Sequence, residues 1–174
     1  MQILDERMLL FIQEHLRNDV LTPVMRLFTT MGDAGLIWIA LGIVLLAFAA
    51  TRKRGAVYLV ALACTAVINN LVLKSIIARP RPYDTIEGLL VLTEKLSSYS
   101  FPSGHASSSF AAATALTLLF GRKGAWSFIP AAIIALSRSY LGMHYVTDIA
   151  AGAVLGALCA FCTVKLIGKK TGIQ

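Results

Sequence analysis

Long uncharged stretches separated by short polar or basic segments dominate the pattern of the chain. The first two, 34–51 and 55–73, contain 18 and 19 residues without a charge. A helix of about 20 apolar residues crosses the hydrocarbon core of a bilayer, so these stretches predict transmembrane helices. The second helix continues through Lys74 and must end by Ala78, because two prolines follow. The whole pattern predicts five spans, at residues 34–51, 55–78, 103–120, 125–140 and 146–167.

The first 31 residues follow a different pattern. Within segment 2–17, apolar residues lie mainly on one helical face and charged or amide residues on the other, although Asp5 and Leu10 interrupt this order. The density of charge excludes a spanning helix and predicts an amphipathic helix that lies in the membrane interface. A second short helix is expected from Pro23 to Met31.

The composition supports a membrane protein. The chain of 174 residues is 57% hydrophobic and 14% charged, with a mean hydropathy of +0.73, whereas soluble domains contain about 25% charged residues. We therefore expect an all-α fold: a polytopic membrane helix bundle of about five transmembrane helices plus an N-terminal interfacial amphipathic helix. The whole chain, 1–174, forms one domain, with the interfacial segment at 2–31 and the transmembrane bundle at 34–170.

The positions of the basic residues and of the cysteines argue against two further classes, namely nucleic-acid-binding proteins and proteins with a redox motif or a structural metal site. The 16 basic residues, against 9 acidic ones, are dispersed among apolar runs and form no polar face for nucleic acid. Cys64, Cys159 and Cys162 lie inside apolar segments, so we expect packing residues and neither a redox motif nor a structural metal site.

Small residues indicate where the predicted helices pack closely. Gly152 and Gly156 have the G-x-x-x-G spacing that lets two helix backbones approach, and small residues at 107–109 and 111–113 have the same effect on the third span.

The basic clusters orient the bundle. If residues 52–54 face the cytoplasm, alternation places eight basic residues and no acidic one on that side, as the positive-inside rule expects. All nine carboxylates and the long polar loop 79–101 then lie on the extracytoplasmic side. The other basic residues of the cytoplasmic side are Arg122, Lys123, Lys165, Lys169 and Lys170.

Three cations from different segments approach the extracytoplasmic side. Lys74 and Arg81 flank the end of the second span, and Arg138 must lie in the fourth helix or at its mouth, because only 14 uncharged residues separate it from Lys123. Cations at this depth are costly unless they meet an anion, and together they suit a phosphoryl group. For Arg79 and for Lys95 in the loop, we expect side chains that reach the lipid headgroups.

The third span begins with a sequence suited to an anion. Pro102 and Ser103 favour a helix start near residue 103, where unpaired N–H groups and the helix dipole attract phosphate. Gly104 leaves room for a ligand against the backbone, and His105 stands where it can exchange a proton with that ligand.

His144 and Asp148 are four residues apart and share one helical face. The carboxylate can hold one ring N–H and leave the other nitrogen as a nucleophile, while the second imidazole, His105, protonates the departing oxygen.

These residues spell a pattern in three parts: Lys74-x6-Arg81-Pro82, Pro102-Ser103-Gly104-His105, and Ser137-Arg138-x5-His144-x3-Asp148. The pattern resembles the signature of the type 2 phosphatidic acid phosphatase (PAP2) superfamily. The resemblance implies a phosphatase without a metal or other cofactor, with His144 as nucleophile, Asp148 as its partner and His105 as general acid. It also implies that phosphate is bound by Lys74, Arg81, Ser103, Gly104 and Arg138. Many membrane members look six-spanning, whereas here the segment 2–31 replaces the first span.

The expected activity is hydrolysis of a lipid phosphate or diphosphate through a phosphohistidine, at the extracytoplasmic face of a bacterial-type inner membrane. Candidate substrates are undecaprenyl diphosphate, which we favour, phosphatidylglycerol phosphate and phosphatidic acid. A lipid phosphotransferase using the same site and a non-catalytic lipid-binding module are the alternatives; the transmembrane composition excludes a soluble haloperoxidase. Membrane lipids are the expected surroundings, and the sequence leaves the oligomeric state open.

Overall fold

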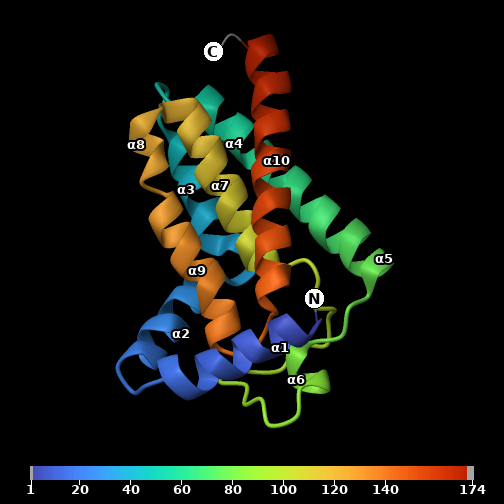
Figure 1. Cartoon of the computed structure of the whole chain (residues 1–174). Helices are drawn as coiled ribbons and strands as arrows, with labels where there is room; N and C mark the ends of the chain where they lie inside the picture. Colours follow the sequence, from blue (N-terminus) through green and yellow to red (C-terminus); the bar gives the residue numbers. More distant parts are fainter. Residues whose placement is uncertain (1, 172–174) are drawn as a thin grey trace.

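The helices of the protein follow its apolar stretches, because a helix satisfies its backbone N–H and C=O groups internally where no water can do so. The computed structural model describes residues 2–171 and contains no strand within that range. Figure 1 shows the long helices packed along one another. They are α3 (Leu36–Ala47), α4 (Arg52–Val67), α7 (Gly104–Phe120), α9 (Phe128–Tyr140) and α10 (Val146–Thr171). The shorter elements are α1 (Gln2–Phe11), η1 (Ile12–Leu16), α2 (Leu21–Gly32), η2 (Asp33–Gly35), η3 (Ile68–Leu73), α5 (Lys74–Ile77), α6 (Pro82–Thr85) and α8 (Arg122–Ala125).

Three helical stretches within the described residues are long and apolar enough to cross a membrane, namely Leu21–Ala47, Arg52–Thr85 and Val146–Gly168. An all-helical membrane fold is therefore confirmed. The helix α7, with 17 residues, is at the lower end of the length of a spanning helix, and α9, with 13 residues, is shorter. The count of five spans stays a prediction.

The limits predicted for the first span, 34–51, are wrong at both ends. The helical stretch starts in α2 at Leu21 and changes direction at η2, where Ala34 has φ 51° and Gly35 has φ 70°. It stops at Ala47, where the Thr51 hydroxyl donates to the Leu45 carbonyl at 2.7 Å across the following turn. Apolar content alone does not reveal either feature.

The end of the second span is as predicted. α4 continues through the π-helical element η3 and through α5, which leans away from α10 in Figure 1. The helix stops at Ile77, and Ala78 turns the chain with φ 47°. Lys74 therefore lies on the last turn of this helix, at the level where the long loop begins.

The predicted close packing of α10 is confirmed. A side chain at Gly152 would lie 2.6 Å from the Ser103 carbonyl oxygen, and one at Gly156 would clash with the Ser107 carbonyl oxygen of α7. The alanines at 111–113 are fully buried against this contact. Helix α7 thus lies at the centre of the bundle, with its first turn held against the first turns of α10.

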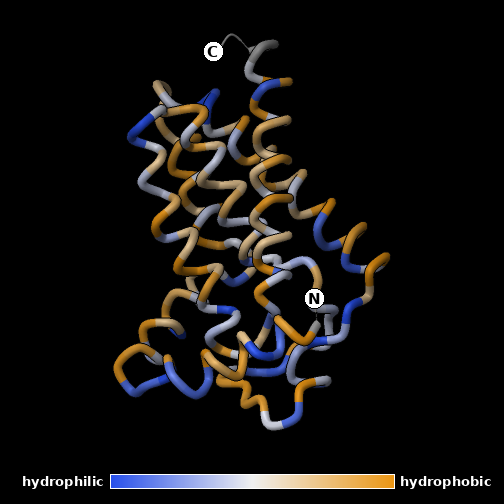
Figure 2. Tube along the Cα trace, viewed as in Figure 1, coloured by the Kyte–Doolittle hydropathy of each residue, from blue (hydrophilic) through white to orange (hydrophobic). Residues whose placement is uncertain are grey.

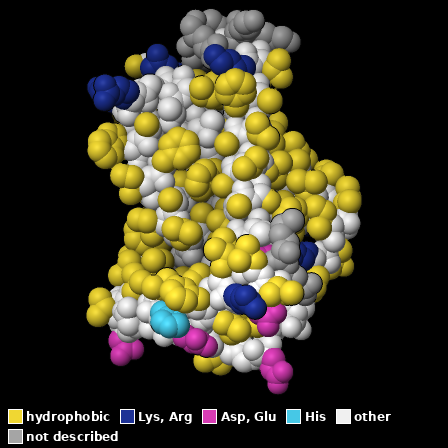
Figure 3. Space-filling model, in the orientation of Figure 1, with side chains coloured by type: hydrophobic (Ala, Val, Ile, Leu, Met, Phe, Trp, Pro, Cys, Tyr) yellow, Lys and Arg dark blue, Asp and Glu magenta, His cyan; other side chains and the backbone are white. Residues whose placement is uncertain are grey.

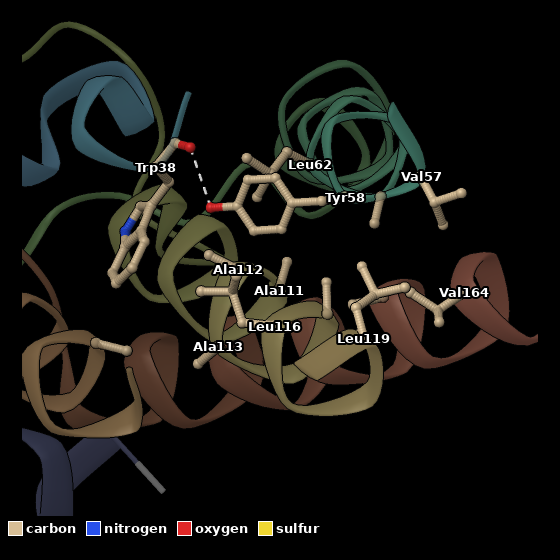
Figure 4. Close-up of a cluster of buried hydrophobic side chains, with 14 of the residues drawn as sticks. Trp38, Val57, Tyr58, Leu62, Ala111, Ala112, Ala113, Leu116, Leu119 and Val164 are labelled. Atoms are coloured by element: carbon tan, nitrogen blue, oxygen red, sulfur yellow. Dashed lines mark hydrogen bonds between the residues drawn. The ribbon is translucent and has the colours of Figure 1, made fainter. Parts of the chain in front are cut away.

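A hydrophobic cluster fills the bundle between α3, α4, α7 and α10 (Figure 4). Within it, the Tyr58 hydroxyl donates to the Trp38 carbonyl at 3.0 Å, and the Trp38 indole donates to the Ser109 hydroxyl at 2.9 Å. These bonds satisfy the few polar groups of the cluster and fix α3 against α4 and α7.

The N-terminal helix α1 lies across the end of the bundle, beside α6 and the long loop (Figure 1). Leu9 is fully buried and packs with Ile86, Leu89 and Tyr145. The opposite face of α1 exposes Ile3, Leu4, Met8 and Phe11. An amphipathic helix is therefore present, with Asp5 on its buried face, and its place in the membrane interface stays a prediction.

Polar residues gather at the two ends of the bundle and a hydrophobic belt lies between them (Figure 2). In the view of Figure 3, acidic side chains appear at the end that carries α1 and α6, whereas basic side chains appear both there and at the end that carries α8. The side chains of Lys169 and Lys170, which the sequence assigns to the basic end, lie outside the described residues.

Candidate active site

A cavity of about 420 Å³ opens where η2, the α4–η3–α5 stretch, α7 and α9 meet the long loop. Six of the eight residues predicted from the sequence line it: Lys74, Arg81, Gly104, His105, Arg138 and His144. Asp148 lies directly behind His144, and Ser103 lies behind the first turn of α7. Residues separated by up to 74 positions thus meet in one place.

The three cations of the cavity have no carboxylate partner. Among the described side chains, the ion pairs involve other groups, and none includes Lys74, Arg81 or Arg138. The Nε atom of Arg138 is buried and has no hydrogen-bond acceptor, although Nη1 donates to the Thr29 hydroxyl at 2.5 Å. Buried cations without a counter-ion are unfavourable, so the cavity is suited to an anionic ligand.

The loop holds Arg81 rigidly in this position. Its guanidinium donates to the Ser98 carbonyl at 2.7 Å, the Met143 carbonyl at 3.0 Å and the Tyr99 carbonyl at 3.3 Å. Nη1 also lies 3.4 Å from Nε2 of His144. Arg81 therefore presents positive charge beside the imidazole with little freedom to move.

The first turn of α7 has the structure that its sequence predicts. Ser103 is the N-cap, and its hydroxyl accepts from the Ala106 N–H at 3.5 Å. The hydroxyl therefore faces the helix and does not line the cavity. A Cβ at Gly104 would lie 3.8 Å from the side chains of Asn69 and Asn70, in ordinary contact, so its absence leaves the space to a ligand. The N-terminal dipole of α7 adds positive potential to this wall.

His144 lies in the loop between α9 and α10, and its two ring nitrogens have different environments. Nδ1 lies 3.4 Å from Oδ2 of Asp148, while Nε2 lies beside Arg81. Asp148 also accepts from the Ser100 hydroxyl and, at 3.0 Å, from the Tyr145 N–H. Burial lowers the pKa of His144 to about 4, so the imidazole is neutral near pH 7. With the Nδ1 proton held by Asp148, Nε2 carries the lone pair that can attack, and this lone pair faces the Arg81 guanidinium.

His105 has a carboxylate of its own. Its Nε2 lies 3.1 Å from both Oδ1 of Asp33 and the Thr29 carbonyl. Since both partners accept, Nε2 carries a hydrogen. Thr29 also binds Arg138 through its hydroxyl, so the end of α2 connects a histidine and an arginine of the cavity.

The sequence analysis did not predict three of these groups, namely Thr29, Asp33 and Ser100. Asp33 lies 72 positions from His105, and no spacing rule links them. The predicted orientation places all nine carboxylates of the chain at this end of the bundle. It therefore indicates that a carboxylate could contact His105, but not which one.

The interpretation of Arg79 as a lipid-facing cation is wrong. Nη1 of Arg79 donates to Asp148 at 2.6 Å, and Nη2 donates to Asp5 at 2.8 Å. Lys95 is exposed and lies over the Tyr83 ring at 5.2 Å. Only the second of the two loop cations is therefore available to lipid.

Comparison with known proteins shows which family the chain resembles. The family model described as PAP2 superfamily matches residues 54–171. The chain is 33% identical over 132 residues to an undecaprenyl-diphosphatase of Sulfolobus acidocaldarius, covering 75% of this chain and 63% of that protein. It is 28% identical over 167 residues to a lipid A 4'-phosphatase of Bacteroides thetaiotaomicron, covering 88% and 72%.

Two crystal structures have the same fold. One is a transmembrane PAP2-type phosphatidylglycerolphosphate phosphatase from Bacillus subtilis, with a TM-score of 0.78, 27% identity, and coverage of 97% of this chain and 86% of the other. The second is LpxE from Aquifex aeolicus, with a TM-score of 0.79, 27% identity, and coverage of 91% and 93%. The chain spans less than two thirds of the length of the undecaprenyl-diphosphatase that it matches.

Proposed function

The chain belongs to the PAP2 superfamily, and from this membership and the cavity we propose that it hydrolyses a lipid phosphate or diphosphate through a phosphohistidine. One observation carries the proposal. A neutral imidazole backed by a carboxylate, His144 with Asp148, faces a cavity that contains three cations, none of which forms an ion pair with a described carboxylate. A phosphoryl group supplies both the missing negative charge and an electrophile for Nε2.

In the first step, Nε2 of His144 attacks phosphorus while the bond from phosphorus to the leaving oxygen breaks. Lys74, Arg81 and Arg138 neutralise the equatorial oxygens as charge spreads over them, and the N–H groups at the start of α7 add to this stabilisation. His105 donates its proton to the leaving oxygen. Asp33 accepts the hydrogen bond of Nε2 and fixes the orientation of the ring.

In the second step, His105 accepts a proton from water as the water oxygen attacks the phosphohistidine. The nitrogen–phosphorus bond breaks, inorganic phosphate is released, and His144 returns to its neutral state. The two steps need no metal, because the three side-chain cations supply the positive charge at the phosphoryl oxygens.

The lining of the cavity supports a lipid substrate. Besides its charged groups, the cavity contains Gly35 at the start of α3 and Ala66 in α4. Outside it, Leu71 and Ile76 are exposed on the η3–α5 stretch. A phosphate held by the cations can thus leave its hydrocarbon tail beside the η3–α5 stretch, toward the bilayer. The relatives named above act on lipid phosphates, which agrees with this placement.

We place the site at the extracytoplasmic face of the cell membrane, in a bundle of five spans, because the cavity lies at the end opposite the basic cluster of α8. Undecaprenyl diphosphate is the substrate that we favour. Phosphatidylglycerol phosphate and phosphatidic acid are the competing substrates.

The test is phosphate release by the purified protein in detergent, with undecaprenyl diphosphate, phosphatidylglycerol phosphate, phosphatidic acid and lipid A as substrates. We expect release from at least one lipid, strongest with the diphosphate, and none from His144→Ala. Transfer of the phosphoryl group to an added lipid acceptor instead of water would identify a phosphotransferase. Equal release by wild type and His144→Ala would overturn the proposed chemistry.

A further inference from the structure

Arg79 joins two buried carboxylates that lie far apart in the sequence. One branch of its guanidinium donates to Oδ1 of Asp148 at 2.6 Å, and the other donates to Oδ2 of Asp5 at 2.8 Å. The carboxyl groups of Asp5 and Asp148 are 1% and 0% exposed, respectively. Bidentate geometry of this kind is specific to arginine, because the ammonium of a lysine cannot present two fixed branches.

Asp5 is itself fixed on its other side. Its Oδ1 accepts from the Thr147 N–H at 3.1 Å, and its Oδ2 accepts from the Thr147 hydroxyl at 2.5 Å. Arg79 donates to the same hydroxyl at 2.8 Å. Asp5 therefore contacts the first turn of α10 next to Asp148, and the network includes no freely rotating member.

The network leaves one oxygen of Asp148 for His144. Oδ1 is bound by Arg79, whereas Oδ2 accepts from Ser100 and Tyr145 and faces Nδ1 of His144. Rotation of the carboxyl group would break the bond to Arg79. The connection from α1 to the imidazole thus runs from Asp5 to Arg79, from Arg79 to Asp148, and from Asp148 to His144.

The face of Arg79 is also covered. Its guanidinium carbon lies 3.7 Å from the centre of the Tyr145 ring, and Tyr145 packs with Leu9 of α1. The same helix therefore supports Arg79 by charge, through Asp5, and by packing, through Leu9. Its outer face exposes Ile3 and Phe11, which suits the membrane interface.

We propose that Asp5 and Arg79 are positioning residues for the nucleophile, so that His144 is aligned only while the interfacial helix α1 is docked on the bundle. This inference rests on the proposed function. It assigns no chemical step to either residue, and it connects the membrane surface to the reaction centre through four side chains.

The first test compares kcat and KM in Asp5→Asn and Arg79→Gln. Misplacement of a reacting group by about 1 Å costs on the order of 100-fold in rate. We expect kcat to fall about 10- to 100-fold with KM within about twofold of wild type, because the phosphate-binding cations are unchanged. The matched controls are Glu6→Gln, an exposed carboxylate next to Asp5, and Lys95→Gln, an exposed cation of the same loop; both should behave as wild type.

A double variant tests whether Asp5 acts through Arg79. In the Arg79→Gln background, Asp5→Asn should lower kcat by less than about twofold, because the connection is already broken. Arg79→Lys should restore only part of the rate. If the losses of kcat in the double variant are independent and multiply, the proposed connection from Asp5 through Arg79 and Asp148 to His144 is overturned. Wild-type kcat values in both single variants would also overturn it.

The third test is the pH dependence of kcat/KM, read as the midpoint pH of its acid limb. A smaller fraction of folded protein lowers the rate but does not shift this midpoint. Loss of the Arg79 charge leaves more negative potential at His144 and should move the limb to higher pH, whereas Asp5→Asn should move it to lower pH or leave it in place. The other groups facing His144 are constant in these variants: Arg81, Arg138 and Asp148, with Lys74 and His105 across the cavity. A limb at the wild-type pH in Arg79→Gln would contradict the proposal.

Failure of this inference is distinct from failure of the proposed function. The positioning role of Asp5 and Arg79 alone would be refuted if wild type is active, His144→Ala is inactive, and Asp5→Asn and Arg79→Gln are both fully active. An inactive wild type on every lipid phosphate would refute the function itself.

Discussion

Oδ1 of Asp33 lies 3.1 Å from Nε2 of His105, so each of the two histidines of the cavity has an aspartate partner. The two pairs differ in exposure. The carboxyl group of Asp148 is fully buried, whereas that of Asp33 is 57% exposed. A fixed, buried carboxylate suits an imidazole that acts as a nucleophile, and a hydrated one suits an imidazole that must exchange protons with solvent.

The leaving group should separate the roles of the two histidines. His144→Ala removes the attacking nitrogen and should abolish phosphate release and any covalent phosphoenzyme. His105→Ala removes the proton donor, worth about 10²–10⁴-fold, and should impair lipid monophosphates most while sparing a nitrophenyl phosphate. Equal loss on both substrates would show that His105 binds phosphate instead. A labelled phosphoenzyme that persists in His144→Ala would place the nucleophile elsewhere.

Asp33→Asn should lower the rate in the same substrate-dependent way as His105→Ala, but by a smaller factor. The amide keeps the size of the side chain but loses the negative charge that holds the ring N–H of His105, so we expect a loss of about tenfold on a lipid monophosphate and less on a nitrophenyl phosphate. Steady-state rates on the two substrates measure the difference. Asp19→Asn, an exposed carboxylate outside the cavity, is the control. A loss independent of the leaving group would argue against a role in proton transfer.

The activity should persist to unusually low pH. Attack requires neutral His144, and burial lowers its pKa from 6.5 to about 4, so protonation removes the nucleophile only as pH falls through about 4. The rise of kcat/KM with pH, which reports groups of the free protein, should have its midpoint near 4. A midpoint near 6.5 would mean that the free protein exposes His144 to water.

Impermeant thiol reagents should distinguish the two ends of the bundle. In a variant without the three native cysteines, Leu90→Cys should react in intact cells, and Lys123→Cys should react only after permeabilisation. Both positions are exposed, so access to the compartment decides the result. Reversed labelling would place the cavity at the cytoplasmic face and change the pool of available lipid.

Phosphate release should survive excess chelator and should be inhibited by vanadate. The three cations of the cavity carry the charge that a metal would supply, and vanadate adopts the five-coordinate geometry of a transferring phosphoryl group. The rate with chelator, compared with the rate after magnesium is added back, is the measurement. Loss of activity with chelator and its recovery with magnesium would contradict the mechanism.

The sequence predicts well whatever depends on local pattern. Helix α7 begins at Gly104 with Ser103 as its cap, and the second span stops at Ile77, because proline, serine and the helix period act within a few residues. The residues that meet in the cavity also follow from their motif spacing. What the sequence does not reveal are partners that only the tertiary fold brings together.

Arg79 and Asp5 illustrate this limit. They are 74 positions apart, and each has an ordinary local explanation, one as a headgroup-facing cation and the other as an interruption of an amphipathic helix. Burial of both charges becomes favourable only once α1 lies across the start of α10. The end of α3 at Ala47 differs from this case, because the bond found there, from the Thr51 hydroxyl to the Leu45 carbonyl, is local.

The bend at η2 limits how this protein can be recombined with its relatives. A side chain at Gly32 would lie 2.5 Å from Ile134 and 2.7 Å from His105, and Gly35 has a positive φ. The residues on both sides of the bend belong to the cavity. A chimaera joined at residue 33, between the predicted interfacial segment 2–31 and the predicted bundle 34–170, would therefore divide the reaction centre between two parents. The turn at 48–51 is the first junction beyond the bend, and a swap made there transfers Asp5, Thr29 and Asp33 together.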